Sequence, residues 1–438
     1  MPLSGYRGRA AEALRRAGVS VGDKIRIVKY RQTYEGILFP RSEYADDSHV
    51  VIKLRNGYNI GVELTDGAAI EFLGKGDKPR FASAPAPEER PQLPRISIVS
   101  TGGTIASRVD YRTGAVQPAL TAEDLYHFVP EISDIARIKA KVLCSEFSEN
   151  IGPNHWRDMA RVTLEEIKDG VDGMVFSHGT DTMGYTAAAL SFALRTLPCP
   201  VVFVGAQRSS DRPSSDSASN LIAASKLAAV APFAHVVVAM HETISDEYVS
   251  IHFGTRVRKC HTSARDAFRT VDPRPLGHVN LRTLELEVLT DRFETRDRSK
   301  TPSVMANFEE KVALVKSHPN FNPIIIDWYR ENGYRGIVLE GTGLGHVGKV
   351  CFEPLRRAIE AGLLIGMTSQ CIWGTVDMNV YETGRDLVAM GVTPLGDMIS
   401  ETAYVKMMWV LGQTRDISKA KDMMLTNIAG EFSQRRLP

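Results

Sequence analysis

Short runs that alternate apolar and polar residues fill the first part of the chain. Alternation with a period of two places every second side chain on the same face, so such runs predict half-buried β-strands. Turn-forming pairs such as Asn56-Gly57 and Asp66-Gly67 separate them, and a short helix is expected over residues 6–17. Five short strands of this kind predict a small SH3-like β-barrel domain over residues 1–76. The expected strands are residues 24–30, 34–39, 49–54, 59–64 and 69–73.

A proline-rich segment separates this unit from the rest of the chain. Residues 77–94 contain five prolines among small and charged residues, without an apolar period. Because proline fixes its backbone and lacks an N–H donor, this composition predicts an extended linker.

Beyond the linker, fully apolar runs alternate with helical stretches. Apolar runs without alternation suit parallel strands buried on both faces, and strands that alternate with helices predict an α/β fold. We therefore expect a large parallel-sheet domain over residues 95–290 and, after a charged break at residues 291–303, a smaller α/β domain over residues 304–438. The expected strands are residues 96–100, 173–177, 201–205, 235–240, 312–316, 336–339 and 364–367, and the expected helices are residues 156–168 and 186–195 and a closing helix at residues 400–412.

The bulk composition narrows the possible functions. The 438 residues carry a formal net charge of +1, which gives no support for strong autonomous nucleic-acid binding. The cysteines are scattered without a CxxC pair, so neither a disulfide framework nor a zinc site is indicated. The first residues show no signal peptide and no apolar run is long enough to span a bilayer, so we expect a cytoplasmic protein without membrane association.

The first candidate for chemistry follows the strand expected at residues 96–100. Thr101-Gly102-Gly103-Thr104 stands at its carboxyl end, where open α/β sheets bind ligands. The glycines permit close backbone approach, and a hydroxyl beside backbone N–H groups supplies a nucleophile and an oxyanion site for acyl transfer. A tight turn without function is the alternative.

Two further polar clusters follow. Gly179, Thr180 and Asp181 stand after the strand expected at residues 173–177. Two strand-end threonines of one sheet can face a common pocket, and Asp181 can hold an ammonium group or orient a base; a helix cap is the alternative. Lys259 lies in a basic segment, RVRKCHTSARD, where a lysine can serve as a base; a solvated basic loop is the alternative.

Two other patterns have simpler explanations. Gly343-Leu-Gly345-His-Val-Gly348 fits GxGxxG after a strand, but the next strand lacks the acidic residue that a dinucleotide site expects. We therefore expect a ligand-side loop of the small domain, and no cofactor in this chain. The spacings of the histidines at positions 235, 241, 252 and 261 match no metal motif, so no metal site is expected.

Together, TGGTIAS and HGTDTM resemble the paired signature of the asparaginase/glutaminase family, in the same order. The resemblance extends from about residue 95 to the C-terminus and implies a two-domain asparaginase-like fold. It implies that Thr101 is the nucleophile and that Thr180, Asp181 and Lys259 complete the catalytic set, with Lys259 and Thr180 as a proton-handling pair. Whether Lys259, acting through Thr180, or Tyr111 is the base for Thr101 is left open.

The same resemblance implies a set of substrate-binding residues. Tyr111 matches a tyrosine of a mobile lid, and Ser148 and Glu149 match a segment that grips the α-amino and carboxylate groups of the substrate. The usual glutamine of that segment is Glu149 here, which departs from the family pattern. The residues so implied are Gly102, Gly103, Tyr111, Ser148, Glu149 and Gly179.

The residues before the first signature extend the resemblance. Simple asparaginases begin close to that signature, whereas residues 1–94 precede it here. This layout resembles the D subunits of archaeal-type glutamyl-tRNA(Gln) amidotransferases. It implies that the chain releases ammonia from Gln or Asn, that it forms the homodimer core of a heterotetramer, and that an E subunit binds the tRNA, uses ATP and Mg²⁺ to activate the misacylated Glu and receives the ammonia. The sequence has no GxxxxGK[ST] phosphate loop, which agrees with ATP binding to a partner.

Three functional hypotheses follow. The chain is an ammonia-producing amidotransferase subunit, a free-standing asparaginase or glutaminase with an added domain, or a non-catalytic RNA- or protein-binding module on a hydrolase scaffold. The presence of Thr101, Thr180, Asp181 and Lys259 argues against the third, and the N-terminal barrel favours the first over the second.

Overall fold

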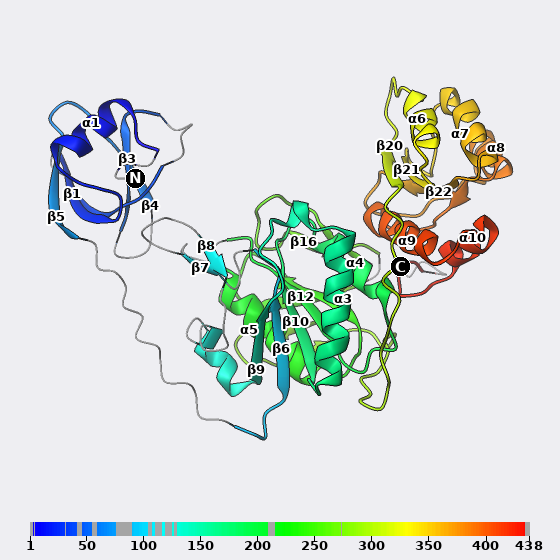
Figure 1. The fold of residues 1–438 in the computed structure, drawn as a ribbon, viewed down its shortest axis with the longest axis horizontal. Coiled ribbons are helices and arrows are strands. Elements are labelled where there is room, and N and C mark those ends of the chain that lie inside the picture. Colours follow the sequence, from blue (N-terminus) through cyan, green and yellow to red (C-terminus); the bar gives the residue numbers. More distant parts are fainter. Residues whose placement is uncertain are drawn as a thin grey trace.

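The chain folds into three parts in the computed structural model (Figure 1): a small N-terminal β domain, a large α/β domain and a smaller C-terminal α/β domain. None of the helices in the described part of the chain combines the length and apolar composition needed to traverse a lipid bilayer. The residues that the structure describes are 3, 5–30, 32–41, 46–54, 59–75, 90–103, 107–109, 116–118, 125–126, 129–208, 215–272 and 274–433.

The N-terminal part is an antiparallel sheet of five strands in the order β4-β3-β2-β1-β5. Ile25 and Ile27 of β1 are fully buried in its core, as the period of two requires. The preceding helix adds Leu14 to the same core, and the Tyr6 hydroxyl donates to the carbonyl oxygen of Phe39 at 2.7 Å. The small β domain expected from the sequence is therefore present. Its elements are α1 (Gly8–Arg16), β1 (Asp23–Lys29), β2 (Gln32–Leu38), β3 (His49–Lys53), β4 (Asn59–Glu63) and β5 (Ala69–Lys75).

The large domain is built on an eight-stranded sheet in the order β18-β17-β14-β13-β12-β10-β6-β9. The strands from β9 to β13 are parallel to one another, whereas β14, β17 and β18 are antiparallel to their neighbours, so the expected parallel sheet is only part of the observed one. The connection between β13 and β14, residues 242–247, is too short for the crossover that a parallel neighbour needs. The strands are β6 (Arg95–Ser100), β9 (Arg137–Val142), β10 (Gly173–Ser177), β12 (Val201–Val204), β13 (Val236–His241), β14 (Tyr248–Phe253), β17 (Gly277–Asn280) and β18 (Leu286–Val288).

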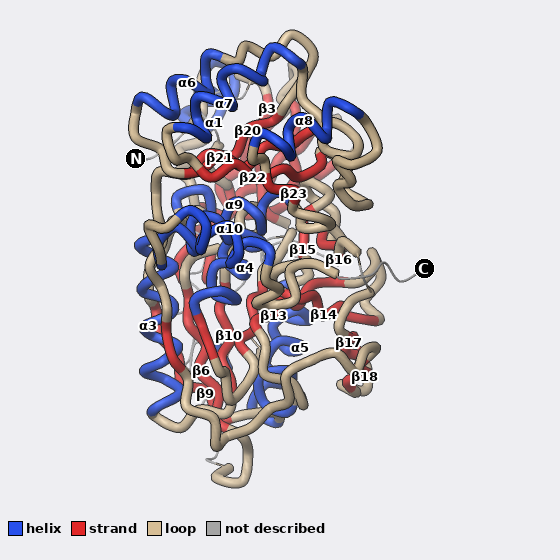
Figure 2. Tube along the Cα trace, turned by 90° about the vertical axis from the view of Figure 1, so that its right-hand side faces the viewer, coloured by secondary structure: helices blue, strands red, loops and turns tan. Residues whose placement is uncertain are grey.

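Helices cover both faces of this sheet (Figure 2). Met174 and Phe176 of β10 belong to the core with α3 and α4, whereas Val175 belongs to the core with α5. The helix expected at residues 186–195 begins earlier and stops at Ala193, because the next two residues pair as β11 with β19. The remaining elements of this part are η1 (Pro130–Asp134), η2 (Ser148–Asn150), α3 (Pro153–Lys168), α4 (Met183–Ala193), α5 (Ser217–Val230) and the paired short strands β7 (Ser107–Val109) with β8 (Val116–Pro118), β11 (Leu194–Arg195) with β19 (Ser303–Val304), and β15 (Val257–Lys259) with β16 (Phe268–Thr270).

The C-terminal domain has a parallel sheet in the order β20-β21-β22-β23. Helix α9 packs between this sheet and α4 of the large domain, where the rings of Trp409 and Phe192 stack with centroids 5.9 Å apart. Helix α10 follows, so the expectation that α9 closes the chain is wrong; Asp416 caps α10 by accepting from two of its backbone N–H groups. The elements are β20 (Val312–Lys316), α6 (Ile324–Glu331), β21 (Gly336–Gly341), η3 (Lys349–Cys351), α7 (Phe352–Glu360), β22 (Leu364–Ser369), α8 (Glu382–Met390), β23 (Thr393–Pro394), α9 (Ser400–Gln413) and α10 (Ile417–Leu425).

A buried histidine in the large sheet makes the stability of the fold sensitive to acid. His252 of β14 is 3% exposed, and its Nδ1 lies 2.7 Å from the hydroxyl of Thr270. Burial, with a smaller contribution from Arg269, lowers the pKa of His252 from 6.5 to about 3. The unfolded chain therefore binds this proton at a higher pH than the folded chain does. The contribution of His252 to the free energy of unfolding is present above pH 6.5 and is lost as the pH falls towards 3.

We expect His252→Gln to flatten this acid dependence. Between pH 6.5 and pH 5, His252 should account for about 2 kcal/mol of lost unfolding free energy. Urea denaturation of the wild type and the variant at pH 7 and pH 5 measures the difference. An equal loss in both proteins would show that His252 is not buried in the neutral form.

Candidate active site

The two threonine clusters meet at one edge of the large sheet. Strands β6 and β10 are parallel neighbours with Ser100 opposite Ser177, so both strands leave the sheet at the same point. Thr101 is fully buried there. Its backbone N–H and its hydroxyl both donate to the carbonyl oxygen of Ser177, at 3.1 and 2.8 Å. Thr101 is therefore held directly by the strand that leads to Thr180.

Gly102 and Gly103 let the turn after β6 approach two other loops. Gly102 has a φ of +118°, and a Cβ built there would lie 2.2 Å from the carbonyl oxygen of Glu146. Gly103 has a φ of +78°, and its Cβ would lie 2.9 Å from the backbone nitrogen of Gly179. Only glycine accepts both this backbone conformation and this crowding.

Gly102→Ala is expected to destabilise the protein by about 1–3 kcal/mol more than Gly170→Ala does. Gly170 is the matched control because its φ is also positive, +86°, while nothing lies within 4 Å of a Cβ built there. The difference isolates the contact with Glu146 from the backbone strain that both variants share. Urea denaturation of the two variants measures it; equal losses would contradict the close approach of the two loops.

Lys259 joins Thr180 and Asp181 in one hydrogen-bonded cluster. Its Nζ lies 2.9 Å from the Thr180 hydroxyl oxygen and 2.7 Å from a carboxylate oxygen of Asp181. Lys259 is the last residue of the short strand β15. The side chain of Lys259 is 13% exposed and that of Asp181 71% exposed, so the lysine is much better shielded from solvent than its carboxylate partner. Lys259 does not lie in a solvated loop, which was the alternative.

Ser148 and Glu149 lie in η2, beside the loop that follows β10. Ser148 is buried, and a Cβ built at Gly179 would lie 2.8 Å from its Cβ. The hydroxyl of Thr182 donates to the carbonyl oxygen of Ser148 at 2.5 Å. Glu149 is exposed. The structure thus brings Ser148 against the second signature and leaves Glu149 on its solvent side, while Tyr111 lies outside the described residues.

The segment that leads from β9 into η2 also reaches the site, although only Ser148 and Glu149, which follow it, were expected there from the sequence. The backbone N–H of Glu146 donates to the carbonyl oxygen of Thr101 at 3.2 Å, and the thiol of Cys144 donates to the same oxygen at 3.3 Å. The signal that could have found this segment is its place directly after a strand. Strand β9 is parallel to β6 and lies beside it, so its carboxyl end is at the same edge of the sheet.

A neutral histidine lies behind the second signature. His178 is 1% exposed, and burial lowers its pKa to about 4, so the imidazole carries no charge near neutral pH. Its Nδ1 lies 2.6 Å from the carbonyl oxygen of Gly179. His178 therefore shapes the loop that carries Thr180 without adding a positive charge beside Lys259.

The glycine-rich segment at residues 343–348 packs against another loop of the small domain. The Ser369 hydroxyl donates to the carbonyl oxygen of Gly343 at 2.6 Å, and the backbone N–H of Asp377 donates to the carbonyl oxygen of Leu344 at 3.1 Å. Among the described residues, no group of three or more His, Cys, Asp and Glu side chains has an arrangement that could hold a metal ion.

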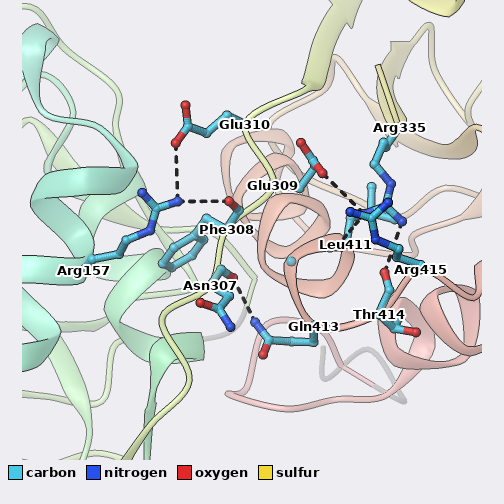
Figure 3. A pocket seen from close by; sticks show the side chains of 11 residues that line it. Arg157, Asn307, Phe308, Glu309, Glu310, Arg335, Leu411, Gln413, Thr414 and Arg415 are labelled. Carbon is cyan, nitrogen blue, oxygen red and sulfur yellow. Dashed lines mark hydrogen bonds and ion pairs between the residues drawn. The ribbon is translucent and has the colours of Figure 1, made fainter. Parts of the chain in front are cut away.

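A polar cleft of about 480 Å³ lies at the joint between the two α/β domains (Figure 3). Arg157 of α3 donates to the carbonyl oxygen of Phe308 at 3.2 Å and contacts the Glu310 carboxylate at 3.3 Å. Across the cleft, Arg335 donates to the carbonyl oxygen of Leu411 at 2.7 Å. None of the candidate catalytic residues lines this cleft. Arg157 and Arg335 hold the segment that joins the domains, through Phe308, Glu310 and Glu309.

Comparison with protein families supports a composite architecture. The model described as "Asparaginase, N-terminal" matches residues 95–292, and "Glutaminase/Asparaginase C-terminal domain" matches residues 311–424. The model described as "GatD N-terminal domain" matches residues 19–73. Two successive asparaginase domains behind a separate N-terminal domain confirm the fold class expected from the sequence.

Individual relatives cover nearly the whole chain. The D subunit of the glutamyl-tRNA(Gln) amidotransferase of Methanopyrus kandleri is 50% identical over 99% of this chain and 96% of the relative. Its counterpart in Pyrococcus furiosus is 50% identical over 97% of this chain and 98% of the relative. Among solved structures, the L-asparaginase of Thermococcus kodakarensis covers 78% of this chain and 100% of its own, with a TM-score of 0.69 and 31% identity. The chain therefore belongs to the family of glutamyl-tRNA(Gln) amidotransferase D subunits, whose larger part has the asparaginase fold.

Proposed function

We propose that this chain is the glutaminase subunit of a tRNA-dependent amidotransferase, which releases ammonia from the side-chain carboxamide of Gln, or of Asn. One observation carries the proposal. Lys259, Thr180 and Asp181 form a single hydrogen-bonded cluster, and the loop that holds Thr180 lies against the turn that follows Thr101. The candidate nucleophile, the candidate proton-handling pair and a carboxylate thus come from separate segments to one edge of the sheet, which supports the proposal.

In the proposed reaction, the hydroxyl oxygen of Thr101 attacks the carboxamide carbon. To do so, the hydroxyl turns away from the carbonyl oxygen of Ser177, to which it now donates. Backbone N–H groups of the turn around Gly102 stabilise the oxyanion of the tetrahedral intermediate. The leaving nitrogen takes a proton and departs as ammonia, and an acyl-threonine ester forms. Water then hydrolyses the ester, which regenerates the hydroxyl and releases Glu or Asp.

A base must take the proton of Thr101, because a neutral hydroxyl is a weak nucleophile. Lys259 acting through Thr180 is one candidate, supported by the 2.9 Å contact between them. Asp181 holds the other side of the ammonium group and orients it. Tyr111 is the other candidate.

The ammonia acceptor in the proposed reaction is a tRNA-bound Glu on a partner. The relatives are named as subunits of a glutamyl-tRNA(Gln) amidotransferase. We propose an E-type partner that binds ATP, Mg²⁺ and Glu-tRNA(Gln) in the cytoplasm, and a homodimer of this chain at the centre of a heterotetramer. This chain then needs no cofactor of its own.

The test is ammonia release from Gln and from Asn by the purified chain, alone and with the E subunit and Glu-tRNA(Gln). We expect weak release by the chain alone and a strong increase with the partner and the charged tRNA. Vigorous release that is indifferent to the partner would instead identify a free-standing asparaginase or glutaminase. No release under either condition would overturn the proposal in favour of a binding module.

A further inference from the structure

Arg256, just before the strand that carries Lys259, is held by the C-terminal end of the chain. Its side chain is 2% exposed and donates hydrogen bonds to three residues. The guanidinium donates to the carbonyl oxygen of Gly430 at 2.8 Å, to the carboxylate of Asp397 at 3.1 Å and to the hydroxyl of Ser433 at 3.0 Å. All three acceptors belong to the C-terminal domain, whereas Arg256 belongs to the large one.

The residue before it is held in the same way. The Thr255 hydroxyl donates to the carbonyl oxygen of Ala429 at 3.0 Å, and the carbonyl oxygen of Thr255 accepts from the Thr402 hydroxyl at 2.9 Å. The segment at residues 427–433, which we call the C-terminal clamp, thus binds the two residues that lead into β15.

A buried ion pair anchors the clamp to α9. Lys406 and Glu431 are both fully buried, with Nζ and the carboxylate 2.5 Å apart. Lys406 also donates to the carbonyl oxygen of Thr426 at 2.7 Å, and Glu431 accepts from the backbone N–H groups of Ile428 and Ala429 at 3.0 and 2.6 Å. A buried pair whose remaining hydrogen-bonding positions are also used holds its backbone in one place, because separating it leaves an unpaired buried charge.

Strand β15 depends on such contacts for its position. It pairs only with β16 and lies outside the eight-stranded sheet, among the strands that the structure describes. On its other side it packs on α4, where a Cβ built at Gly184 would lie 3.1 Å from the carbonyl oxygen of Val257. The start of β15 is thus held between α4 and the C-terminal clamp, and Lys259 stands at its end.

We infer that Arg256 and the C-terminal clamp are positioning elements of the active site, which hold Lys259 at Thr180. The inference rests on the function proposed above for Lys259. A shift of β15 would carry the ammonium group away from the Thr180 hydroxyl, and a misplacement of about 1 Å can cost a catalytic group up to about a hundredfold in rate. The rival explanation is that the clamp only fastens one domain to the other.

Three variants separate positioning from fastening. Arg256→Lys keeps the charge but cannot reach the three acceptors together. Ser433→Ala removes one acceptor, and Ser433→Thr restores the hydroxyl. The matched control is Arg335→Lys, because Arg335 also donates to a backbone carbonyl oxygen, that of Leu411, but lines the polar cleft at the domain joint and makes no contact with the clamp.

We expect Arg256→Lys to lower kcat for ammonia release by roughly tenfold to a hundredfold, with a much smaller change in KM for Gln. Ser433→Ala should show the same pattern at a smaller size, and Ser433→Thr should recover the wild-type kcat. Arg335→Lys should leave kcat unchanged. These rates are measured on the full chain, with its partner subunit and charged tRNA present.

Native cysteines report the position of β15 without any catalysis. Cys260 follows Lys259 and is exposed, whereas Cys199 and Cys351 are buried in the two cores. Iodoacetamide labelling, resolved by peptide mass spectrometry, should be faster at Cys260 in Arg256→Lys than in the wild type. Exposed Cys371, on another loop, is the internal standard, and Cys199 and Cys351 should stay protected.

The outcomes distinguish the inference from the proposed function. If Lys259→Met keeps wild-type activity, the role of Lys259 fails, and the inference fails with it. If Lys259→Met is inactive but Arg256→Lys has normal kcat and normal Cys260 labelling, the positioning role alone is overturned. The positioning role is likewise overturned if every loss of kcat is accompanied by increased labelling of Cys199 and Cys351. The clamp would then only fasten one domain to the other.

Discussion

Thr101→Ala is expected to lower kcat/KM for ammonia release from Gln by at least about a thousandfold. The variant removes the only atom that forms the proposed ester, and no other described hydroxyl follows β6 at the same point. It also removes a buried hydrogen bond of 2.8 Å to the carbonyl oxygen of Ser177, which should cost about 1–3 kcal/mol of stability. Ammonia release and urea denaturation, measured on the same preparation, check the two effects separately.

Thr101→Ser is the control for this prediction. Serine keeps the hydroxyl and its hydrogen bond to the carbonyl oxygen of Ser177, so the variant should have measurable activity. It lacks the methyl group that limits the rotamers of the threonine side chain. Ammonia release that survives undiminished in Thr101→Ala would exclude the threonine mechanism. Loss in Thr101→Ser equal to that in Thr101→Ala would mean that the methyl group, and not the hydroxyl alone, is required.

Lys259→Met is expected to lower kcat by at least about a hundredfold. Methionine has a similar length and shape but offers no proton and no charge, so Thr180 and Asp181 both lose the partner that they have at 2.9 and 2.7 Å. Because the side chain is only 13% exposed, water does not readily replace the ammonium group. The measurement is single-turnover ammonia release, which separates chemistry from product release.

Lys259→Arg distinguishes a role of Lys259 in proton transfer from a purely electrostatic role. Arginine keeps the positive charge beside Asp181 but stays protonated, so it cannot act as a base. Activity as low as that of Lys259→Met supports proton handling, whereas substantial recovery would assign Lys259 an electrostatic role only. Wild-type activity in Lys259→Met would remove Lys259 from the mechanism and leave Tyr111 as the candidate base.

Much of the architecture could be predicted because its signals are local. The strand at Gly173–Ser177 has the bounds expected from its apolar run, and β20 likewise. Burial on both faces leaves such a run without alternation, whatever its neighbours are. The antiparallel strands β14, β17 and β18 were missed because their direction depends on pairing with β13 and with one another, which no local pattern encodes.

The candidate site likewise has a part that could be predicted from the sequence and a part that could not. The signature threonines could be placed at strand ends from the sequence, since glycine and polar residues directly after an apolar run mark the carboxyl end of a strand. The backbone of Glu146 against Gly102 could not be predicted, because that contact requires β9 to lie beside β6. Nor could the hydrogen bond from Thr101 to Ser177, which depends on the register of β6 with β10.

The sequence by itself determined that a small β domain precedes a larger α/β part, because periodicity is a property of short segments. Its paired signatures resemble the asparaginase family, and this resemblance supplied the fold family and the candidate catalytic residues. Only the tertiary structure decided that Lys259 reaches Thr180 and Asp181, and that Arg256 is gripped by residues 427–433. The physical reason is that these contacts join segments far apart in the chain. Their geometry follows from the order of strands, the packing of α4 against α9 and the burial of the Lys406–Glu431 pair, none of which is a local property.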